Sequence, residues 1–281
     1  MNPNCENSVF DFISVGFPVH NGEKYIFNAI NSILSQSHKH FELIISDNAS
    51  TDSTSEICKE FARRDSRVIY YRQESNIGAN KNFKFTLNKA KYEYFVWMAH
   101  DDEWHPKYIE SCILALNEDS AASIVFCEYY VKNLITGKLI RHRSSCSNSL
   151  NKRTRYITRL LNPMPSIVYG VFRTKVIKEI SIEDFDYADL HLTHILAIDY
   201  VVKIIPQALF ITGTEGSKGL YSLSSKKYIS PSQYLAKTRI LLNKNFSWPV
   251  ALILFFLTRY ICLKNTSIFN KMIKNGQRFE I

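Results

Sequence analysis

The chain has 281 residues, of which 46% are hydrophobic and 22% are charged, and these fractions are typical of a globular protein. The composition argues against collagen-like, coiled-coil and disordered chains, and the length allows a full hydrophobic core without disulfides. The formal net charge of +9 favours an anionic partner, namely a nucleic acid, a membrane surface or a phosphorylated small molecule, unless it reflects only a coding bias toward Lys, Asn and Ile.

The six cysteines include no C-x-x-C pair, so the sequence carries no zinc or redox motif of that type. Most of them lie among apolar residues, as expected of buried thiols in a reducing compartment. Residues 1–8 contain no apolar run of the kind found in a secretory signal. We therefore expect a cytoplasmic protein.

The first part of the chain alternates short apolar runs with segments of helical periodicity. Strands are predicted over residues 12–18, 41–47, 67–71 and 94–98, the first of them stopped by Pro18. Helices are predicted from about residue 26, around 57–61, over 79–90 and around 109–116. This alternation predicts a mostly parallel sheet with right-handed crossovers, and ligands of such sheets bind beyond the carboxyl ends of the strands.

Beyond residue 123 the alternation is less regular. The predicted elements there are a hairpin over 125–128 and 133–140, a basic helix over 152–161, a strand over 168–173, a helix over 188–197 and a strand over 201–205 that ends at Pro206. The expected fold class is therefore α/β, with a Rossmann-like, mostly parallel sheet flanked by helices, a smaller mixed half and a helical C-terminal tail. We place the boundaries at residues 1–122, 123–225 and 226–281.

The tail combines basic and apolar residues, and Glu280 is its single acidic side chain. Its apolar run, Trp248–Leu263, is shorter than the roughly 20 residues of a bilayer span and is interrupted by Arg259. Three interpretations remain open: an interfacial helix resting on anionic lipid, a buried core or dimer helix, and a true span.

Acidic residues follow the predicted strands. Asp101 and Asp102 come directly after the fourth strand, where adjacent like charges are costly unless a hard divalent cation binds their oxygens. Because Mg²⁺ is commonly held by one or two carboxylates together with substrate phosphates, the pair indicates a metal–diphosphate site. The alternative is a solvated turn before the helix that begins near Pro106. Asp47 ends the second strand, where it can accept hydrogen bonds from a nucleoside or cap the next helix.

The glycine turn at residues 76–80 could contact a nucleoside or be a plain loop-to-helix turn. Together with the acidic residues, it makes the chain resemble family 2 glycosyltransferases over about residues 10 to 215. The segments that carry the resemblance are Ile13–Glu23, Ile44–Asp52, Asn76–Gly78 and His100–Asp102. The resemblance implies a GT-A fold in which residues 1–122 bind a nucleotide sugar and residues 123–225 bind the acceptor.

The resemblance also implies an inverting transfer from a nucleotide sugar, expected to be UDP-linked, to a hydroxyl of a glycan or lipid-linked acceptor in surface polysaccharide or lipopolysaccharide synthesis. It implies Mn²⁺ or Mg²⁺ as cofactor, with Asp102 as the metal ligand. The family's more familiar motif has an earlier Asp where this chain has Ala99 or His100, so the metal site is simpler than usual. The implied nucleotide-sugar contacts are Pro18, Val19, Asn21, Glu23, Asp47, Asn76, Gly78, Asn80 and Asp101.

The catalytic base is expected in the second half of the chain, where the candidates are Glu183, Asp184, Asp186 and Asp189. We favour Asp189 and then Asp186, because the family often places this carboxylate at the start of an apolar helix that is followed by a strand ending in proline. The protein is expected to be cytoplasmic and could be peripheral on the inner face of the plasma membrane through Trp248–Leu263.

Two other functions stay open, a nucleotidyltransferase and a non-catalytic nucleotide-sugar-binding protein of the same fold. A nucleotidyltransferase usually has an early Gly-rich basic loop, and residues 17–23 contain a single glycine. The lack of a G-x-G-x-x-G motif after the first strand excludes a dehydrogenase. The basic residues form no recognised nucleic-acid module, so no nucleic acid partner is expected.

Overall fold

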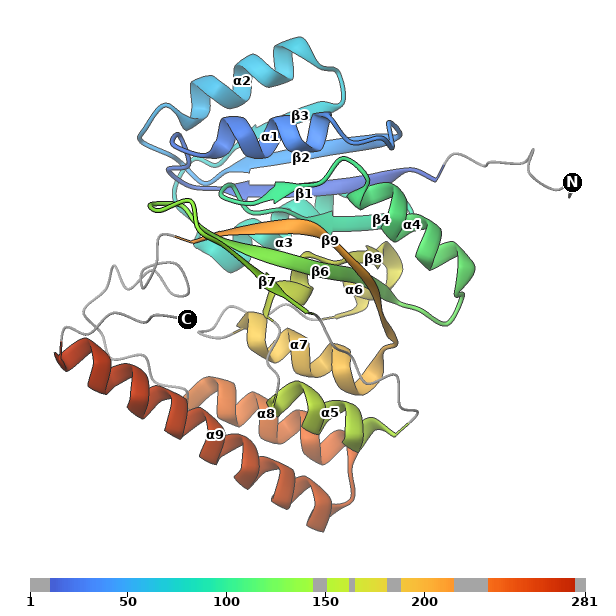
Figure 1. Cartoon of the computed structure of the whole chain (residues 1–281), viewed down its shortest axis with the longest axis vertical. Coiled ribbons are helices and arrows are strands. Elements are labelled where there is room, and N and C mark those ends of the chain that lie inside the picture. Colours follow the sequence, from blue (N-terminus) through green and yellow to red (C-terminus); the bar gives the residue numbers. More distant parts are fainter. Residues whose placement is uncertain (1–10, 144–150, 162–164, 181–187, 215–231, 276–281) are drawn as a thin grey trace, which may run out of the picture.

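The described residues of the computed structural model are 11–143, 151–161, 165–180, 188–214 and 232–275. They form one nine-stranded sheet with the order β3-β2-β1-β4-β8-β6-β9-β5, and β7 pairs with β6 (Figure 1). The first four of these strands are parallel, whereas β8 runs antiparallel to both of its neighbours. The predicted α/β class, with a mostly parallel first half and a mixed second half, is confirmed.

The elements of the first half follow the expected alternation and agree with the predicted elements to within about two residues. The strands are β1 (Ile13–Val19), β2 (Phe41–Asp47), β3 (Val68–Arg72), β4 (Tyr94–Trp97) and the short β5 (Glu103–Trp104). The helices are α1 (Ile26–Leu34), α2 (Thr54–Arg64), α3 (Ala79–Lys89) and α4 (Tyr108–Glu118). β5 was not predicted, because two residues carry no periodicity.

The second half contains shorter strands and more helices. Its strands are β6 (Ile124–Asn133), β7 (Leu139–His142), β8 (Val171–Arg173) and β9 (Val202–Thr214). Its helices are α5 (Lys152–Leu161), the 3₁₀ turn η1 (Pro165–Tyr169), α6 (Thr174–Glu179), α7 (Ala188–Asp199), α8 (Ser232–Asn245) and α9 (Trp248–Asn275). The predicted hairpin is present as β6 and β7, but its first strand runs on to Asn133 and residues 134–138 form the turn. The described part of the tail, residues 232–275, contains two helices.

Two predictions about prolines are wrong. Pro18 lies inside β1 and does not end it. The Gly16 carbonyl accepts the Met98 N–H on the side of β4, and the backbone of Pro18, two residues later, faces the same side. Because β4 has ended at that point, the N–H that proline lacks costs no hydrogen bond between the strands. Pro206 likewise does not end β9, because the register with β6 shifts after Ile205 and leaves the proline in an irregular, bulge-like stretch.

A third prediction also fails in part, because the expected strand over residues 168–173 begins only at Val171. Val168 and Tyr169 belong instead to the 3₁₀ turn η1. β8 is thus a three-residue strand that pairs with β4 on one side and β6 on the other. A short apolar run in the sequence does not distinguish a buried turn from a strand.

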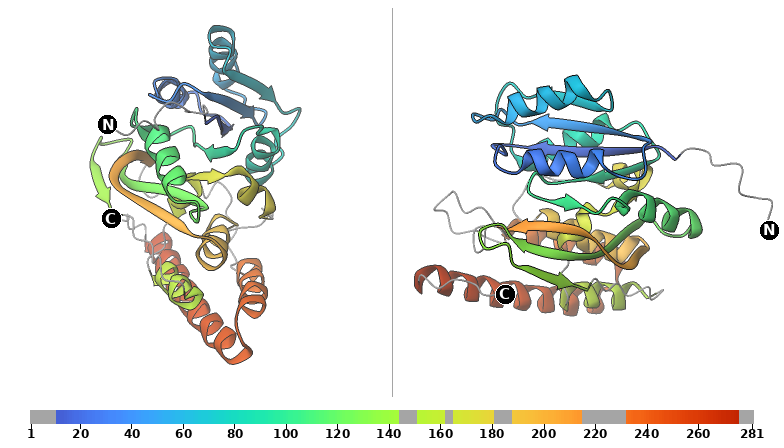
Figure 2. Two further views of the ribbon diagram at one scale, coloured as in Figure 1. Left: turned by 90° about the vertical axis from the view of Figure 1, so that its right-hand side faces the viewer. Right: turned by 45° about the horizontal axis from the view of Figure 1, so that its top comes forward.

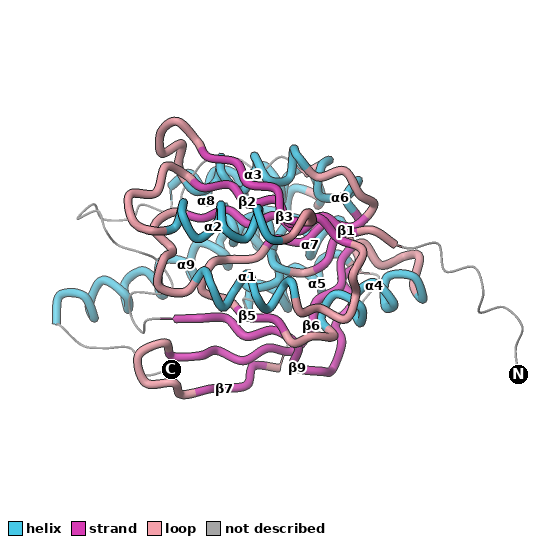
Figure 3. The backbone as a smooth tube through the Cα atoms, turned by 90° about the horizontal axis from the view of Figure 1, so that it is seen from above, coloured by secondary structure: helices cyan, strands magenta, loops and turns pink. Residues whose placement is uncertain are grey.

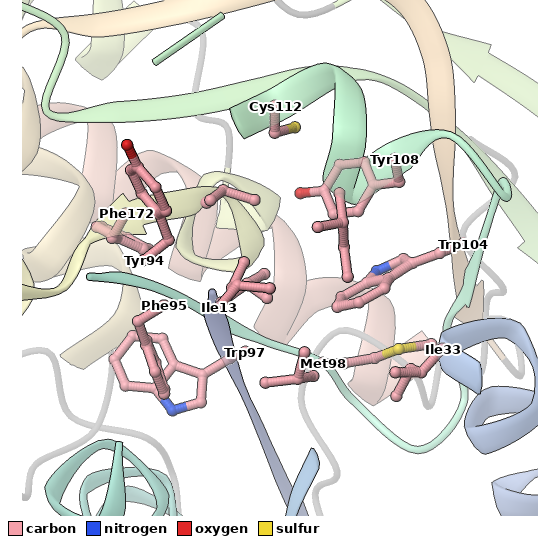
Figure 4. Packing of buried hydrophobic residues seen from close by; sticks show 14 of the residues in the cluster. Ile13, Ile33, Tyr94, Phe95, Trp97, Met98, Trp104, Tyr108, Cys112 and Phe172 are labelled. Carbon is pink, nitrogen blue, oxygen red and sulfur yellow. The ribbon is translucent and has the colours of Figure 1, made fainter. Parts of the chain in front are cut away.

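The core lies between the sheet and its helices. Phe95 and Trp97 of β4 pack with Phe172 of the neighbouring strand β8 (Figure 4). Trp104 of β5 and Tyr108 of α4 form a second aromatic pair. The Trp97 indole N–H donates to the Phe83 carbonyl and the Thr86 hydroxyl, both 3.1 Å away, so its burial leaves no unpaired donor.

A second, smaller core holds the C-terminal helices against the rest of the chain (Figure 2). Its buried members come from α5, α7, α8 and α9, namely Tyr156, Leu160, Ile198, Leu242, Ala251 and Leu254. No helix within the described residues has an apolar stretch long enough to cross a bilayer. The sheet runs continuously past residue 122, and the division into residues 1–122, 123–225 and 226–281 stays a prediction.

Candidate active site

Loops that follow neighbouring strands meet at one edge of the sheet, on the left of Figure 1 and of Figure 3. The register aligns Val19 of β1 with Asp47 of β2, and Asp47 with Arg72 of β3. Asp101 and Asp102 follow β4, the other neighbour of β1. The expectation that the acidic strand ends share one edge is confirmed by this register.

Asp47 is completely buried, and both of its oxygens are used. One accepts the Ser50 backbone N–H at 2.8 Å, and the other accepts the Tyr70 hydroxyl at 2.8 Å and the Arg72 guanidinium at 2.6 Å. Burial alone would raise the pKa of Asp47, but the hydrogen bonds from Ser50 and Tyr70 and the charge of Arg72 outweigh it, so the pKa is lower than usual. Asp47 is therefore an ionised carboxylate that fixes the β2–α2 loop and the end of β3.

Asn21 and Glu23 join the loop after β1 to the loop after β2. The Asn21 side-chain oxygen accepts the Thr51 backbone N–H at 2.8 Å, and the Glu23 carboxylate accepts the Ser53 N–H at 2.9 Å. Asn21 has a positive φ of 51°, a conformation that Asn tolerates better than most residues. These two predicted nucleotide-sugar contacts thus also hold the loop after β2 in place. We call the loops that follow β1, β2, β3 and β4 at this edge of the sheet the rim.

Asn76 and its neighbours complete the rim on the β3 side. The Asn76 side-chain oxygen accepts from Asn48 and from the Gly78 backbone N–H, both at 2.9 Å, and Asn48 accepts the Ile77 N–H at 2.8 Å. Gly78 has a φ of +85°, which favours glycine, and Asn80 lies in the first turn of α3. The Asn76 side chain and the Ile77 backbone therefore connect the glycine turn to Asn48, in the loop after β2.

Pro18 and Val19, predicted to flank the nucleobase, are both buried at the end of β1. A Cβ atom added to Gly22 would lie 2.7 Å from a Val19 methyl group and 3.0 Å from the His100 ring. This close approach brings the loop after β1 against the loop after β4, so all four loops form one continuous rim.

Asp102 is the least satisfied carboxylate of the rim. Its side chain is 1% exposed, and Oδ1 accepts the Gly213 backbone N–H at 3.1 Å, whereas Oδ2 has no hydrogen-bond partner among the residues that the structure describes. Burial and the nearby charge of Asp101 raise the pKa of Asp102 well above its usual value, despite hydrogen bonds from Thr212 and Gly213. An unpaired buried carboxylate oxygen is costly, so this atom favours a cationic partner.

The donor set fits a hard divalent cation that arrives with a diphosphate. Asp102 offers an oxygen without a partner and Asp101 is its neighbour in sequence, which suits Mg²⁺ or Mn²⁺ held by one or two carboxylates plus phosphate oxygens. Within the described ranges, no three His, Cys, Asp or Glu side chains gather into a ready-made cage. The chain thus supplies part of a metal site, and the substrate would supply the rest.

The structure locates one of the two predicted bases. Asp189 lies in the first turn of α7, the apolar helix at whose start it was predicted, while Asp186 lies outside the described residues, as do Glu183 and Asp184. The roles of Asp189 and Asp186 stay predictions.

Sequence reasoning missed four residues that hold the acidic side chains, namely Tyr70, Arg72, Thr212 and Gly213. Tyr70 and Arg72 are two residues apart on β3 and therefore share the face toward Asp47. That period-2 spacing was visible in the sequence, but the register that pairs Arg72 with Asp47 was not.

A family model described as "Glycosyl transferase family 2" matches residues 14–181, more than half of the chain and all four rim loops. The chain belongs to glycosyl transferase family 2. Among curated proteins, this chain is 34% identical over 125 residues to an uncharacterised glycosyltransferase of Rickettsia typhi, covering 44% of this chain and 38% of that protein. It is also 34% identical over 110 residues to the putative teichuronic acid biosynthesis glycosyltransferase TuaG of Bacillus subtilis, covering 39% and 44%.

Solved structures show the same fold. S. aureus TarS 1–349 in complex with UDP-GlcNAc matches with a TM-score of 0.63 and 18% identity, over 83% of this chain and 65% of that one. The mannosyltransferase PcManGT of Pyrobaculum calidifontis, in complex with GDP-Man and Mn²⁺, matches with a TM-score of 0.55 and 13% identity, over 89% and 69%. The predicted GT-A fold is confirmed. The chain spans well under half the length of the first curated relatives that it matches.

Proposed function

We propose that this glycosyltransferase transfers a sugar, with inversion, from a UDP-sugar to a hydroxyl of a glycan or lipid-linked acceptor. The observation that carries the proposal is the Asp102 carboxylate, buried at the carboxyl edge of the sheet with Oδ2 unpartnered. Family membership and the likeness to a fold that binds UDP-GlcNAc in TarS support the donor class.

The metal is Mn²⁺ or Mg²⁺, supported by the Mn²⁺ present in the PcManGT complex. Asp102, with Asp101 beside it, holds the ion, which when bound supplies Lewis-acid stabilisation of the charge on the departing diphosphate. Asp101 also contacts the ribose and the sugar. Pro18, Val19 and Asn76 lie against the nucleoside, and Gly78 and Asn80 line the same side of the site.

Asp47 acts on the nucleoside mainly through its neighbours. Its oxygens already accept from Ser50, Tyr70 and Arg72, and its side chain is completely buried. The Arg72 side chain is 41% exposed and can therefore meet the nucleotide, while Asn21 and Glu23 keep the loop after β2 in place. Asp47 thus positions the groups that recognise the base.

The chemical step is a single displacement. The acceptor oxygen bonds to the anomeric carbon as the bond to the diphosphate breaks, and Asp189 takes the proton of the acceptor hydroxyl. A positioned general base contributes roughly 10²–10⁴-fold to such a reaction. Asp186 is the second candidate for this role.

The acceptor is proposed to belong to a surface polysaccharide or lipopolysaccharide pathway. Support comes from the relative named for teichuronic acid biosynthesis, and the acceptor side of the site is assigned to residues 123–225. The enzyme would work in the cytoplasm, at the inner face of the plasma membrane.

The test is a hydrolysis and binding screen with UDP-, GDP- and dTDP-sugars, with and without Mn²⁺. We expect metal-dependent turnover of a UDP-sugar, reduced at least about 100-fold in Asp102→Asn because a charged ligand is lost. Asp189→Asn should retain donor binding and lose transfer. The matched control is Glu118→Gln, an exposed carboxylate in the last turn of α4.

Turnover that survives both EDTA and Asp102→Asn would contradict the metal role. Metal-dependent donor binding without any turnover would favour the alternative of a non-catalytic nucleotide-sugar-binding protein. Loss of donor binding in Asp189→Asn would assign that residue to binding and leave Asp186 as the base to be tested next.

A further inference from the structure

Helix α9 exposes an apolar face. Trp248 is 73% exposed, Ile253 67%, Phe256 54% and Tyr260 64%. Ile253, Phe256 and Tyr260 are spaced three and four residues apart, so they lie above one another on one side of the helix. Large apolar side chains exposed singly are ordinary, but a row of them on one helix indicates an interaction surface.

The opposite side of α9 is firmly packed. Ala251, Leu254 and Thr258 are buried, and the Thr258 hydroxyl is hydrogen-bonded to the Tyr156 hydroxyl of α5 at 2.6 Å. The Arg239 guanidinium of α8 lies over the Phe255 ring, 5.8 Å from its centre. In Figures 1 and 2, α9 runs along the border of the molecule, and no described element covers its outer side. The orientation of the exposed face is therefore set by the fold.

The net positive charge of the chain is concentrated in the part of the sequence that contains α8 and α9. Residues 226–281 contain ten Lys and Arg residues and one acidic residue, Glu280, so this segment alone accounts for the net charge of +9, and residues 1–225 are neutral. Arg259 is exposed next to Tyr260 on α9, and Lys244 is exposed in the last turn of α8, just before α9 begins. An apolar row bordered by cations complements an anionic lipid surface, where the rings enter the interface and the cations meet the headgroups.

We propose that the face formed by Ile253, Phe256 and Tyr260, together with the exposed Trp248 at the start of the helix, docks in the plane of an anionic lipid bilayer. Helix α9 lies on the surface and does not cross the bilayer, in line with its lack of a spanning stretch among the described residues. The Trp248 and Tyr260 rings sit at headgroup depth, and Ile253 and Phe256 reach the acyl boundary. This inference concerns the partner of α9 and is independent of the chemistry at the sheet edge.

The test is vesicle sedimentation of the full chain with phosphatidylcholine alone and with phosphatidylcholine mixed with phosphatidylglycerol. We expect binding to the anionic vesicles that weakens at high salt. The combined variant Ile253→Ser, Phe256→Ser, Tyr260→Ser should bind at least about tenfold more weakly, because binding scales with the buried apolar area. Lys244→Glu with Arg259→Glu should remove the preference for anionic lipid.

The matched control is Phe27→Ser with Leu114→Ser, two apolar side chains on α1 and α4 that are each 56% exposed and lie outside the proposed face. This control should bind like the wild type, and all variants should keep their thermal transition, because only exposed side chains change. Donor hydrolysis in solution should also be unchanged, so a protein that binds vesicles without hydrolysing any donor would refute the proposed function and leave this inference standing.

Two results would overturn the inference. One is equal vesicle binding by the wild type and the combined variant. The other is a wild type that ignores anionic vesicles but forms a dimer in solution that the combined variant dissolves, which would assign the face to a second copy of the chain.

Discussion

Replacement of Gly213 by alanine is the most direct test of how the fold positions the Asp102 carboxylate. A Cβ atom at Gly213 would lie 2.2 Å from the Asp101 carbonyl oxygen and 3.0 Å from a Leu134 methyl group. An ordinary carbon–oxygen contact is about 1 Å longer than the first of these distances. Because the Asp101 carbonyl belongs to the backbone, either the loop after β4 or the end of β9 must move.

The expected cost follows from the two contacts that the movement disturbs. Overpacking in a tight site costs about 1–3 kcal/mol, and a hydrogen bond to a charged group is worth about 1.5–3 kcal/mol. The second contribution is the Gly213 N–H bond to Asp102 Oδ1, 3.1 Å long. A loss of about 3 kcal/mol corresponds to a fall of roughly 5–10 °C in Tm for a chain of this size.

The decisive measurement is nucleotide binding with and without Mn²⁺, by calorimetric titration of UDP. Gly213→Ala should weaken the Mn²⁺-dependent part of the affinity by about 10–100-fold, as is typical when a group that orients a metal ligand is disturbed. Gly170→Ala is the matched control, because a Cβ there would lie 2.8 Å from the Val125 carbonyl, a backbone oxygen of β6 rather than of the acidic loop. It should lower Tm and leave the Mn²⁺ dependence intact. Equal losses of affinity in the two variants would refute the positioning role of Gly213.

Two further predictions concern the helical layer. Burial lowers the pKa of His194 to about 3, below its ordinary value of 6.5, so the wild type should lose up to about 1.4 kcal/mol of unfolding free energy per pH unit as the pH falls from 6.5 toward 3. Urea titrations at pH 7 and pH 5 should show a smaller loss in His194→Gln, and equal losses would contradict this assignment. Tyr156→Phe and Thr258→Val should each cost about 1 kcal/mol, because each breaks the 2.6 Å hydrogen bond between two buried hydroxyls. A double-mutant cycle by urea unfolding should then give a coupling of at least about 0.5 kcal/mol, and strict additivity would show that the bond contributes nothing.

The first half of the fold could be predicted from the sequence because each of its elements is defined locally. Residues 41–47 are all buried in β2, since helices cover both faces of the parallel sheet, and the three consecutive apolar residues at 43–45 are the pattern expected of such a strand. The Ile26, Ile30 and Ile33 spacing likewise marks the buried face of α1 before any contact is known. The parallel direction of β1 to β4 also followed, because strands that alternate with helices favour a parallel sheet.

Predictions failed where a residue's partner lies far away in the sequence. Whether Pro206 ends β9 depends on how β6 is paired, and the register shift between Cys127 and Tyr129 accommodates the proline. The two residues of β5 form a strand only because the antiparallel neighbour β9 pairs with them at Ile211 and Phe210. No local pattern announces either feature, since both arise from the register of β9.

The same distinction separates the two aspartates that mark the site. In the sequence, Asp47 and Asp102 share a pattern, because each follows an apolar strand and precedes a helix, although only Asp102 has an adjacent aspartate, Asp101. In the fold, Asp47 accepts hydrogen bonds from Tyr70 and Arg72 of β3, whereas Asp102 Oδ1 accepts the Gly213 N–H and its Oδ2 has no partner among the described residues. A buried carboxylate whose two oxygens both accept hydrogen bonds stabilises the fold without a ligand. A buried carboxylate oxygen without a hydrogen-bond partner carries a desolvation cost, which a bound cation removes. The contacts of Asp47 therefore support the proposal that it holds the rim, and those of Asp102 support the proposal that it binds the metal and the donor, although only the folded chain creates these contacts.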